Sequence, residues 1–233
     1  MDNTPGGSGP QRRARAAQRQ QQQRTDTNAP PAGGSKPPGN RPPPPTPVGS
    51  GPHGPDPKWL HTSRAHIQTL TGRHRQSVID YTGDDHKRIN GWLRRGQVPD
   101  DQWITARVKD LDAVLAKNPL TQPATLTRTI DLSSFGLTTG DDLTKVVGSL
   151  RTERGYMSTT RHPSGGATKD YANPVRLTVH APAGTPAAAI EDISKVPGQG
   201  EVLLGRDLRY LITSQHFDAE IGIWRATIEI TER

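Results

Sequence analysis

The chain has 233 residues, a net charge of +7, 24 glycines, 22 prolines and only 4% aromatic residues. It contains no cysteine, so disulfides, thiolate metal sites and cysteine nucleophiles are excluded. No stretch approaches the roughly 20 apolar residues that a membrane-spanning helix needs, so we predict no membrane span.

The first 57 residues differ in composition from the rest of the chain. They hold 14 of the 22 prolines and the glutamine run 20–23, with few large apolar residues. Such a segment cannot bury enough apolar surface to offset the entropy lost on ordering. We therefore predict a disordered tail over residues 1–57 and a single folded domain over residues 58–233. The tail carries most of the positive charge. Two interpretations fit this charge: a solubilising linker, or an arm that binds a polyanion.

Helices are predicted in the first part of the domain, over residues 58–70, 73–81, 84–96 and 100–118. Apolar residues recur there at helical spacing. The third segment begins with two aspartates and ends with Arg94 and Arg95, as the helix dipole favours. Gly96 is then a plausible end of that helix.

After Pro119 the hydrophobic period shifts to two, which is typical of strands. We predict strands over residues 125–132, 155–160, 175–182, 201–205, 208–215 and 223–231, with one helix-like stretch at 140–150. Helices followed by strands indicate an α+β domain with a mixed or antiparallel sheet.

Two patterns suggest chemistry that their context does not support. GSGPHG at 49–54 matches a dinucleotide-binding pattern, but it lies among prolines and neither follows a strand nor opens a helix. The eight histidines include no H-E-x-x-H arrangement, so we predict no metal site.

Polar residues interrupt three of the predicted strands. Arg128 lies in TLTRTID, Ser158 in GYMSTT, and Gln199 precedes Glu201 in PGQGEVLL. Because side chains alternate along a strand, Gln199 and Glu201 share one face. The order of these residues resembles the arginine, Ser-Thr-Ser and Gln/Glu-x-Glu motifs of the NAD-dependent mono-ADP-ribosyltransferases.

The resemblance extends from about residue 60 to the C-terminus. YTGDDHKRINGWLR is similar to the helix before the core in the bacterial exoenzyme and binary-toxin branch, and EVLLGRDLRYLI to the strand that bears the catalytic acid. The resemblance implies a helical lobe packed on two short antiparallel or mixed sheets, with NAD in a central cleft. NAD is then a co-substrate, and no metal is implied.

The resemblance also assigns catalytic roles. Glu201 would hold the ribose and stabilise its positive charge, since cleavage of a glycosidic bond develops charge on the sugar ring. Ser158 would orient Glu201, Arg128 would hold the phosphates, and Gln199 would face the acceptor. The expected cofactor-binding residues are Tyr81, His86 in place of a second aromatic, Asn90, Arg94, Arg128, Thr159 and Arg161.

In this family, a glutamate at the position of Gln199 goes with arginine as the acceptor. Because this chain has a glutamine there, we expect an acceptor other than arginine. Asparagine on a small GTPase in another cell is the first analogy, although Lys195 and Val196 stand where Rho-modifying exoenzymes have an aromatic residue. The alternatives are guanine in nucleic acid, water in an NAD glycohydrolase, and an inactive NAD-fold interaction module with a polyanion-binding tail.

The N-terminus has scattered arginines but lacks the apolar segment of a secretory signal. We therefore expect synthesis in the cytoplasm and delivery to, or release towards, a target cell by a dedicated apparatus, with the tail as one means of engaging it. We also expect the chain to act as a monomer.

Overall fold

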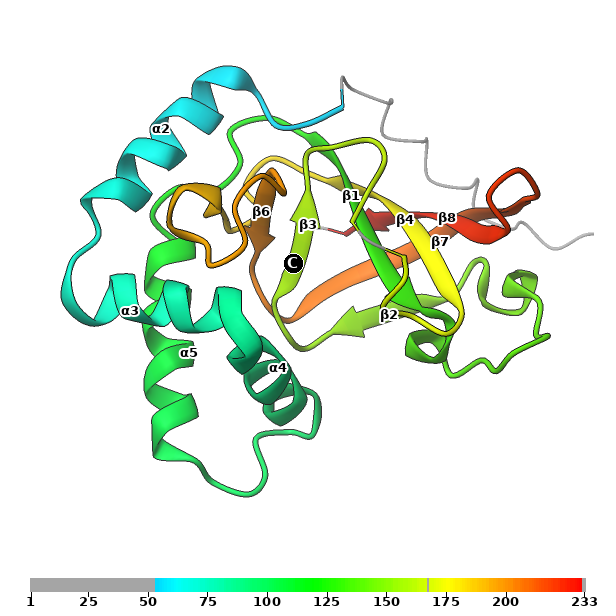
Figure 1. The fold of residues 1–233 in the computed structure, drawn as a ribbon, viewed down its shortest axis with the longest axis horizontal. Coiled ribbons are helices and arrows are strands. Elements are labelled where there is room, and N and C mark those ends of the chain that lie inside the picture. Colours follow the sequence, from blue (N-terminus) through cyan, green and yellow to red (C-terminus); the bar gives the residue numbers. More distant parts are fainter. Residues whose placement is uncertain (1–52, 167, 232–233) are drawn as a thin grey trace, which may run out of the picture. The chain divides into compact units, whose positions relative to one another are not determined.

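A computed structural model describes residues 53–166 and 168–231, so most of the predicted tail lies outside the described residues (Figure 1). The predicted domain boundary falls just inside them. His53 contacts Thr127 through its Nε2, 2.9 Å from Oγ1, and the Gly54 amide donates to the Thr125 carbonyl at 2.7 Å. Chain contacts with the sheet therefore begin before residue 58.

The first part of the domain is helical, as predicted. Its α-helices are α2 (Pro57–Thr69), α3 (Gly72–Asp80), α4 (His86–Arg94) and α5 (Gln102–Leu115). Asp56 caps α2 by accepting from the Trp59 amide, and Asp101 caps α5 by accepting from the Ile104 amide.

A π-helical turn, η1 (Tyr81–Asp85), joins α3 to α4. Gly83 inside it has φ −95° and ψ −151°, which is not helical, so the chain kinks there. The kink separates α4 from α3 without a loop.

Eight strands follow, and the six predicted strands are among them. They are β1 (Ala124–Asp131), β2 (Leu150–Glu153), β3 (Met157–Thr160), β4 (Pro174–Ala181), β5 (Ala187–Ala189), β6 (Glu201–Leu204), β7 (Leu208–Asp218) and β8 (Ile223–Ile230). The helix-like stretch 140–150 forms only a 3₁₀ turn, Leu143–Val146, because Gly140 and Gly148 on either side take left-handed conformations that end it.

The strands form one sheet in the order β2-β7-β8-β4-β1-β3-β6-β5, and among the strand pairs in the described part of the chain only β4 and β8 run parallel. The predicted α+β fold with a mixed sheet is confirmed, and the two predicted short sheets are the two parts of one continuous sheet. A single residue pair, Thr127 with Thr160, joins β1 to β3 and so links a five-stranded part to a three-stranded part. The strands are too divergent there for a longer ladder, as Figure 1 shows.

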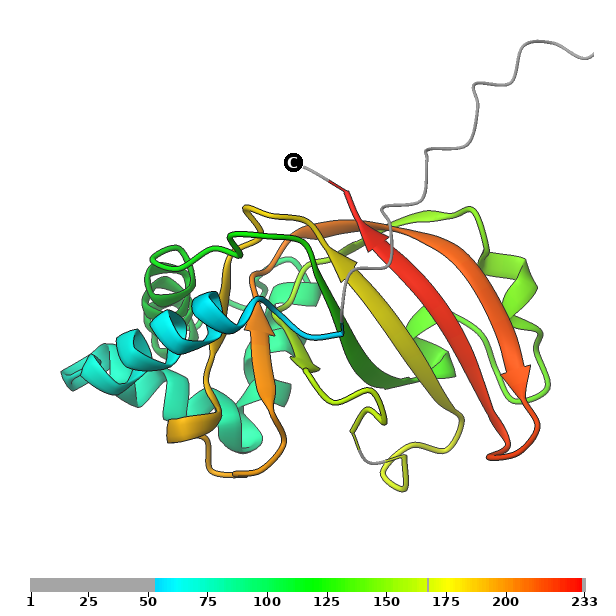
Figure 2. The same ribbon diagram turned by 90° about the horizontal axis from the view of Figure 1, so that it is seen from above.

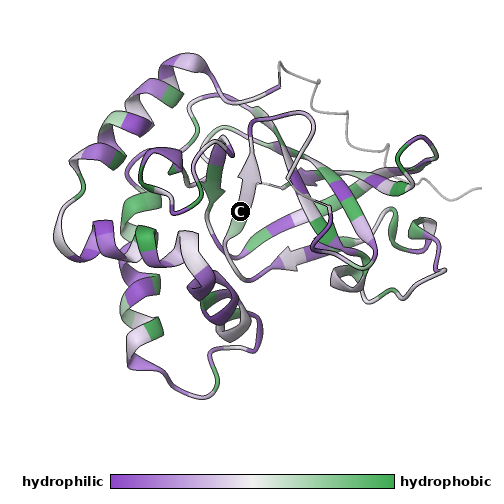
Figure 3. Ribbon diagram, in the orientation of Figure 1, coloured by the Kyte–Doolittle hydropathy of each residue, from purple (hydrophilic) through white to green (hydrophobic). Residues whose placement is uncertain are grey.

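The helices gather at one end of the sheet, beside β3, β5 and β6, whereas β4, β7 and β8 curve away at the other end (Figure 2). Two hydrophobic cores result. One packs between the helices and one face of the three-stranded part, and the other includes the opposite face of that part and extends along the rest of the sheet. Helix α5 alternates between hydrophobic and hydrophilic residues, as expected of a helix with one buried face (Figure 3).

Strand β6 contacts both cores because its side chains alternate. Val202 and Leu204 pack in the core of the sheet, whereas Leu203 packs in the core of the helical lobe. Glu201 is on the same face as Leu203, so it is directed towards the helices. The two-sided burial of β6 thus fixes which way its first residue points.

Buried polar contacts connect the helical lobe to β3. The Asn90 side chain accepts from the Tyr156 amide at 2.9 Å and donates to the Tyr156 carbonyl at 3.2 Å. At its other end, the Tyr156 hydroxyl lies 2.8 Å from Asp112 Oδ1 and 2.9 Å from the Val108 carbonyl of α5. Tyr156 is fully buried, so these bonds form where water cannot replace them.

We expect Tyr156→Phe to lower the free energy of unfolding by about 1 kcal/mol, since it removes a buried hydroxyl bond while keeping the ring. Urea denaturation of the full chain measures this. Tyr210→Phe is the matched control, because no hydrogen bond of the Tyr210 hydroxyl is found within the described residues, and it should leave stability nearly unchanged. Equal losses of unfolding free energy in the two variants would contradict a stabilising role of the Tyr156 hydroxyl bonds.

Candidate functional site

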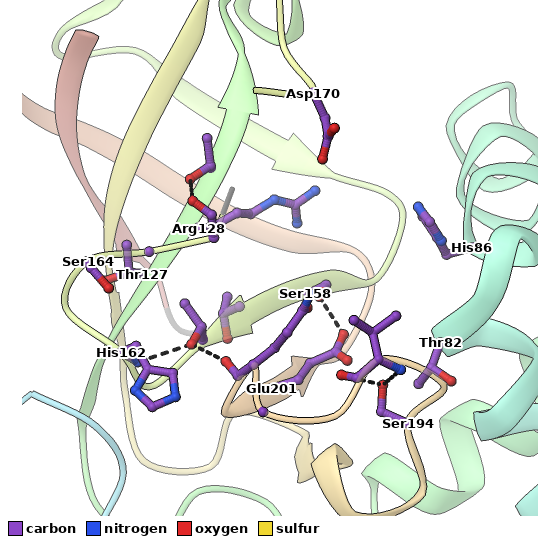
Figure 4. A pocket seen from close by; sticks show the side chains of 18 of the residues that line it. Thr82, His86, Thr127, Arg128, Ser158, His162, Ser164, Asp170, Ser194 and Glu201 are labelled. Atoms are coloured by element: carbon purple, nitrogen blue, oxygen red, sulfur yellow. Dashed lines mark hydrogen bonds between the residues drawn. The ribbon is translucent and has the colours of Figure 1, made fainter. Parts of the chain in front are cut away.

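A cavity of about 610 Å³ opens between the helical segments η1 and α4 and the strands β1, β3 and β6. Arg128 enters it from β1, Ser158 from β3 and Glu201 from β6 (Figure 4). Gln199, in the loop before β6, also lines it. The four residues expected to be catalytic therefore line the same cavity, although they are spread over more than 70 positions of the sequence.

Strand register brings Ser158 and Glu201 together. In the antiparallel pair β3–β6, Thr160 lies opposite Glu201 and Ser158 opposite Leu203, so Ser158 and Glu201 are diagonal neighbours on one face. The Ser158 hydroxyl donates to Glu201 Oε1 at 2.5 Å. A register shift of one residue would turn Glu201 to the other face, so the pairing that builds the core also aims the carboxylate.

Glu201 is 9% exposed. Burial raises the pKa of its carboxyl group, whereas the Ser158 hydrogen bond and the nearby His86 act in the opposite direction. A carboxylate removed from water in this way interacts strongly with any positive charge that develops beside it.

Arg128 is the cation of the site. Its guanidinium group points into the cavity (Figure 4), and its Nη1 is buried without a hydrogen-bond partner among the described residues. A buried unpaired donor costs free energy, and a guanidinium fork matches the oxygens of a phosphate. The arrangement therefore fits one phosphate of a dinucleotide.

The helical wall of the cavity includes Tyr81, His86 and Asn90. Polar groups of two of these residues are engaged within the protein: Asn90 donates to the Tyr81 hydroxyl at 3.0 Å as well as bonding Tyr156. Burial raises the pKa of Tyr81, so its phenol stays neutral. His86 Nδ1 lies 2.5 Å from the Gly83 carbonyl, which can only accept, so this nitrogen carries the proton.

Arg94 and Arg161 do not line this cavity. Arg94 forms a two-pronged ion pair with Glu153, at 2.9 and 2.8 Å, and borders an adjacent cavity of about 480 Å³ that also includes Arg128. The Arg161 guanidinium donates to Glu191 at 3.2 Å. Thr159 does border the main cavity, but its hydroxyl donates to the Val202 carbonyl at 2.6 Å.

Several residues that the sequence did not single out also line the cavity, namely Thr82, Thr127, His162, Asp170, Tyr171 and Ser194. Thr82, Thr127 and His162 are the immediate neighbours of Tyr81, Arg128 and Arg161, which the sequence did mark. Asp170, Tyr171 and Ser194 lie further from the marked residues, in the segments that lead to β4 and β6.

Across residues 53–166 and 168–231, no cluster of three His, Cys, Asp or Glu side chains is arranged to hold a metal ion. No helix in the same part of the chain combines the length and apolar character needed to cross a membrane.

Comparison with known proteins gives a consistent result. The family model "ADP-ribosyltransferase exoenzyme" matches residues 57–230. A search of curated proteins finds no match. Among solved structures, Plx2a, an ADP-ribosyltransferase toxin from Paenibacillus larvae, is 25% identical with a TM-score of 0.65, and the match covers 75% of this chain and 94% of that one.

Two further solved structures share the fold. The C3 exoenzyme of Clostridium limosum is 24% identical with a TM-score of 0.65, over 75% of this chain and 92% of its own. C3stau2 from S. aureus, solved with NAD, is 22% identical with a TM-score of 0.62, and the match covers 76% of this chain and 94% of that one. The chain therefore belongs to the ADP-ribosyltransferase exoenzyme family and is an NAD-dependent ADP-ribosyltransferase.

Proposed function

We propose that this chain transfers ADP-ribose from NAD to a non-arginine side chain of a target protein, most simply asparagine, with Glu201 as its catalytic carboxylate. The observation that carries the proposal is the Ser158–Glu201 pair, bonded at 2.5 Å in a cavity that also holds the unpaired Arg128 donor. A fixed anion and a separate cation are the two charges that NAD cleavage and NAD binding require.

Glu201 acts on the bond between the ribose and nicotinamide. As that bond breaks, its electron pair leaves with nicotinamide and positive charge develops on the ribose ring. The buried carboxylate stabilises this charge, and Ser158 holds the carboxylate in place before the reaction. The acceptor nitrogen then bonds to the ribose carbon and loses a proton.

Arg128 supports the binding of NAD. Its Nη1 would gain the partner that it lacks by donating to a pyrophosphate oxygen. The solved structure of C3stau2 with NAD supports the expectation that this fold holds the dinucleotide. Tyr81, His86 and Asn90 would then form the helical wall of the NAD site, whereas Arg94 and Arg161 would first have to leave Glu153 and Glu191.

Gln199 is suited to recognise an amide. It is exposed at the edge of the cavity, and its backbone is held where the Thr160 hydroxyl donates to its carbonyl at 2.5 Å. A carboxamide offers both a donor and an acceptor, so it can form paired hydrogen bonds with the amide of an asparagine. Since Plx2a is described as a toxin, we further propose that the target lies in another cell and that a dedicated apparatus delivers the chain.

Incubation of the full chain with labelled NAD and a cell lysate tests the proposed function. Label on protein, with the modified residue mapped to asparagine, supports it. Label on nuclease-sensitive material would instead identify guanine as the acceptor, and free ADP-ribose alone would identify a glycohydrolase. Absence of NAD consumption by the folded chain would contradict all three.

We expect Glu201→Gln to lower the rate of nicotinamide release about 100-fold or more, because the amide keeps the shape but removes the charge that faces the ribose. The control is Glu220→Gln, an exposed acid in the β7–β8 turn, which should behave as the wild type. If Glu201→Gln releases nicotinamide at the rate of the control, Glu201 is not the catalytic carboxylate.

The pH dependence of NAD cleavage follows from the raised pKa of Glu201. The carboxylate takes up its proton at a higher pH than an ordinary glutamate, so kcat/KM should fall on acidification at a pH above 4.5, the ordinary glutamate value. Ser158→Ala removes a hydrogen bond to the ionised form and should move this acidic limb to still higher pH. A limb that stays in place or moves to lower pH would show that another group titrates.

We expect Gln199→Ala to reduce transfer to the protein acceptor by about 10-fold or more, since it removes the proposed contact while leaving Glu201 and Ser158 in place. Hydrolysis of NAD without acceptor should change less. Both activities are measured on the same preparation, and equal losses would argue against a role in acceptor recognition.

A further inference from the structure

Glu191 lies at the centre of a partly buried polar cluster outside the cavity. It begins the 3₁₀ turn η4 (Glu191–Ile193) after β5, and its side chain is 14% exposed. Its Oε2 accepts from Arg64 of α2 at 2.9 Å and from Arg161 at 3.2 Å. Its Oε1 accepts from the backbone amide of Gly200 at 3.1 Å.

The carboxylate is ionised in this setting. Burial acts to raise the pKa of Glu191, but the hydrogen bonds from Arg161 and the Gly200 amide outweigh it, so the pKa lies below its ordinary value. Hydrogen bonds donated to an ionised carboxylate are stronger than those between neutral groups. Glu191 therefore ties α2, the loop after β3 and the backbone before β6 to one point.

Gly200, the residue bonded by Glu191, immediately precedes Glu201. Its carbonyl accepts from the Arg161 amide at 3.0 Å, and its φ is +59°. A Cβ at this position would lie 2.7 Å from the His162 ring and 2.8 Å from the Arg161 side chain. The backbone that carries Glu201 is thus enclosed on several sides, and the Glu191 carboxylate fixes the remaining N–H.

The segment between Glu191 and Gly200 is held at few points. Lys195 to Gln199 are exposed, the Lys195 amide donates to Thr82 Oγ1 at 3.1 Å, and the Thr160 hydroxyl donates to the Gln199 carbonyl at 2.5 Å. At the base of the segment, Glu191 accepts from the Gly200 amide, and the Ile190 amide donates to the Glu201 carbonyl at 3.2 Å. Loss of the Glu191 bond would leave the Gly200 N–H without this partner and remove one of the few contacts that hold the chain entering Glu201.

We propose that Glu191 is a positioning residue for NAD cleavage: it clamps the base of the 191–200 segment and so sets the Glu201 carboxylate against the ribose. The proposal rests on the proposed role of Glu201. A displacement of about 1 Å at a reacting group can lower a rate by about 100-fold, so the clamp acts on turnover more than on NAD binding.

Asp192 provides a matched control. It accepts from Gln68 at 3.0 Å and pairs with Arg64 at 3.3 Å, so it contacts the same helix as Glu191. Among the described residues it has no bond to Gly200. Loss of Asp192 therefore weakens the attachment of α2 without releasing the segment that leads to Glu201.

The test compares Glu191→Asp, Asp192→Asn and Glu201→Gln in the full chain, with kcat and KM for nicotinamide release and the melting temperature measured for each. Glu191→Asp keeps the charge between the two arginines but withdraws the carboxylate from Gly200 by one methylene. We expect kcat to fall about 10- to 100-fold, with KM for NAD within about threefold of wild type. Its melting temperature should match that of Asp192→Asn, which should keep wild-type kcat.

The outcomes separate the two proposals. Wild-type kcat for Glu191→Asp, or an equal loss of kcat in Asp192→Asn, would overturn the clamp while Glu201→Gln remains inactive. An active Glu201→Gln would overturn the proposed catalytic acid, and the clamp with it.

Discussion

The single residue pair that joins β1 to β3 is the constraint on which the site depends. Because the pairing of β1 with β3 consists of one residue pair within the described residues, Thr127 with Thr160, the strands separate on either side of it, and the cavity occupies the space between them. A fuller ladder would bring β1 against β3 and leave no room for a dinucleotide. The cation on β1 and the anion on β6 consequently face one cavity from different parts of the sheet.

The rest of the structure keeps this opening in place. The helical lobe is tied to β3 by the bonds between Asn90 and Tyr156, and α2 is tied to the β5–β6 segment by Arg64 and Glu191. These contacts are buried or partly buried, so each would leave an unpaired polar group if broken. The site is thus rigid where Ser158 meets Glu201 and exposed where Gln199 would meet an acceptor.

Much of the site could be predicted from the sequence, because local pattern determines it. The resemblance connected Gln199 and Glu201 to Ser158 and Arg128, and all four line the same cavity. The strand alternation expected for Gln199 and Glu201 does not apply, because β6 begins at Glu201 and Gly200 has a φ of +59°. Helix and strand types were predicted wherever a segment was long enough to show its period. Two short strands were not predicted: β5 consists of three alanines, and β2 begins at Leu150, where the predicted helix-like stretch ends.

The features that could not be predicted are the products of pairing between distant residues. Arg94 bonds Glu153, 59 positions away, and Arg161 bonds Glu191, 30 positions away, so neither arginine lines the main cavity. No local signal marks such partners. The joining of the two sheet parts by one pair, and the role of Glu191, likewise depend on tertiary contacts.

A crystal structure of the full chain with NAD would test the central claim most directly. The account predicts the nicotinamide ribose within hydrogen-bonding distance of Glu201, with Ser158 still bonded to the carboxylate and a pyrophosphate oxygen on Arg128 Nη1. NAD bound elsewhere, or bound in this cavity with its ribose out of contact with Glu201, would contradict it.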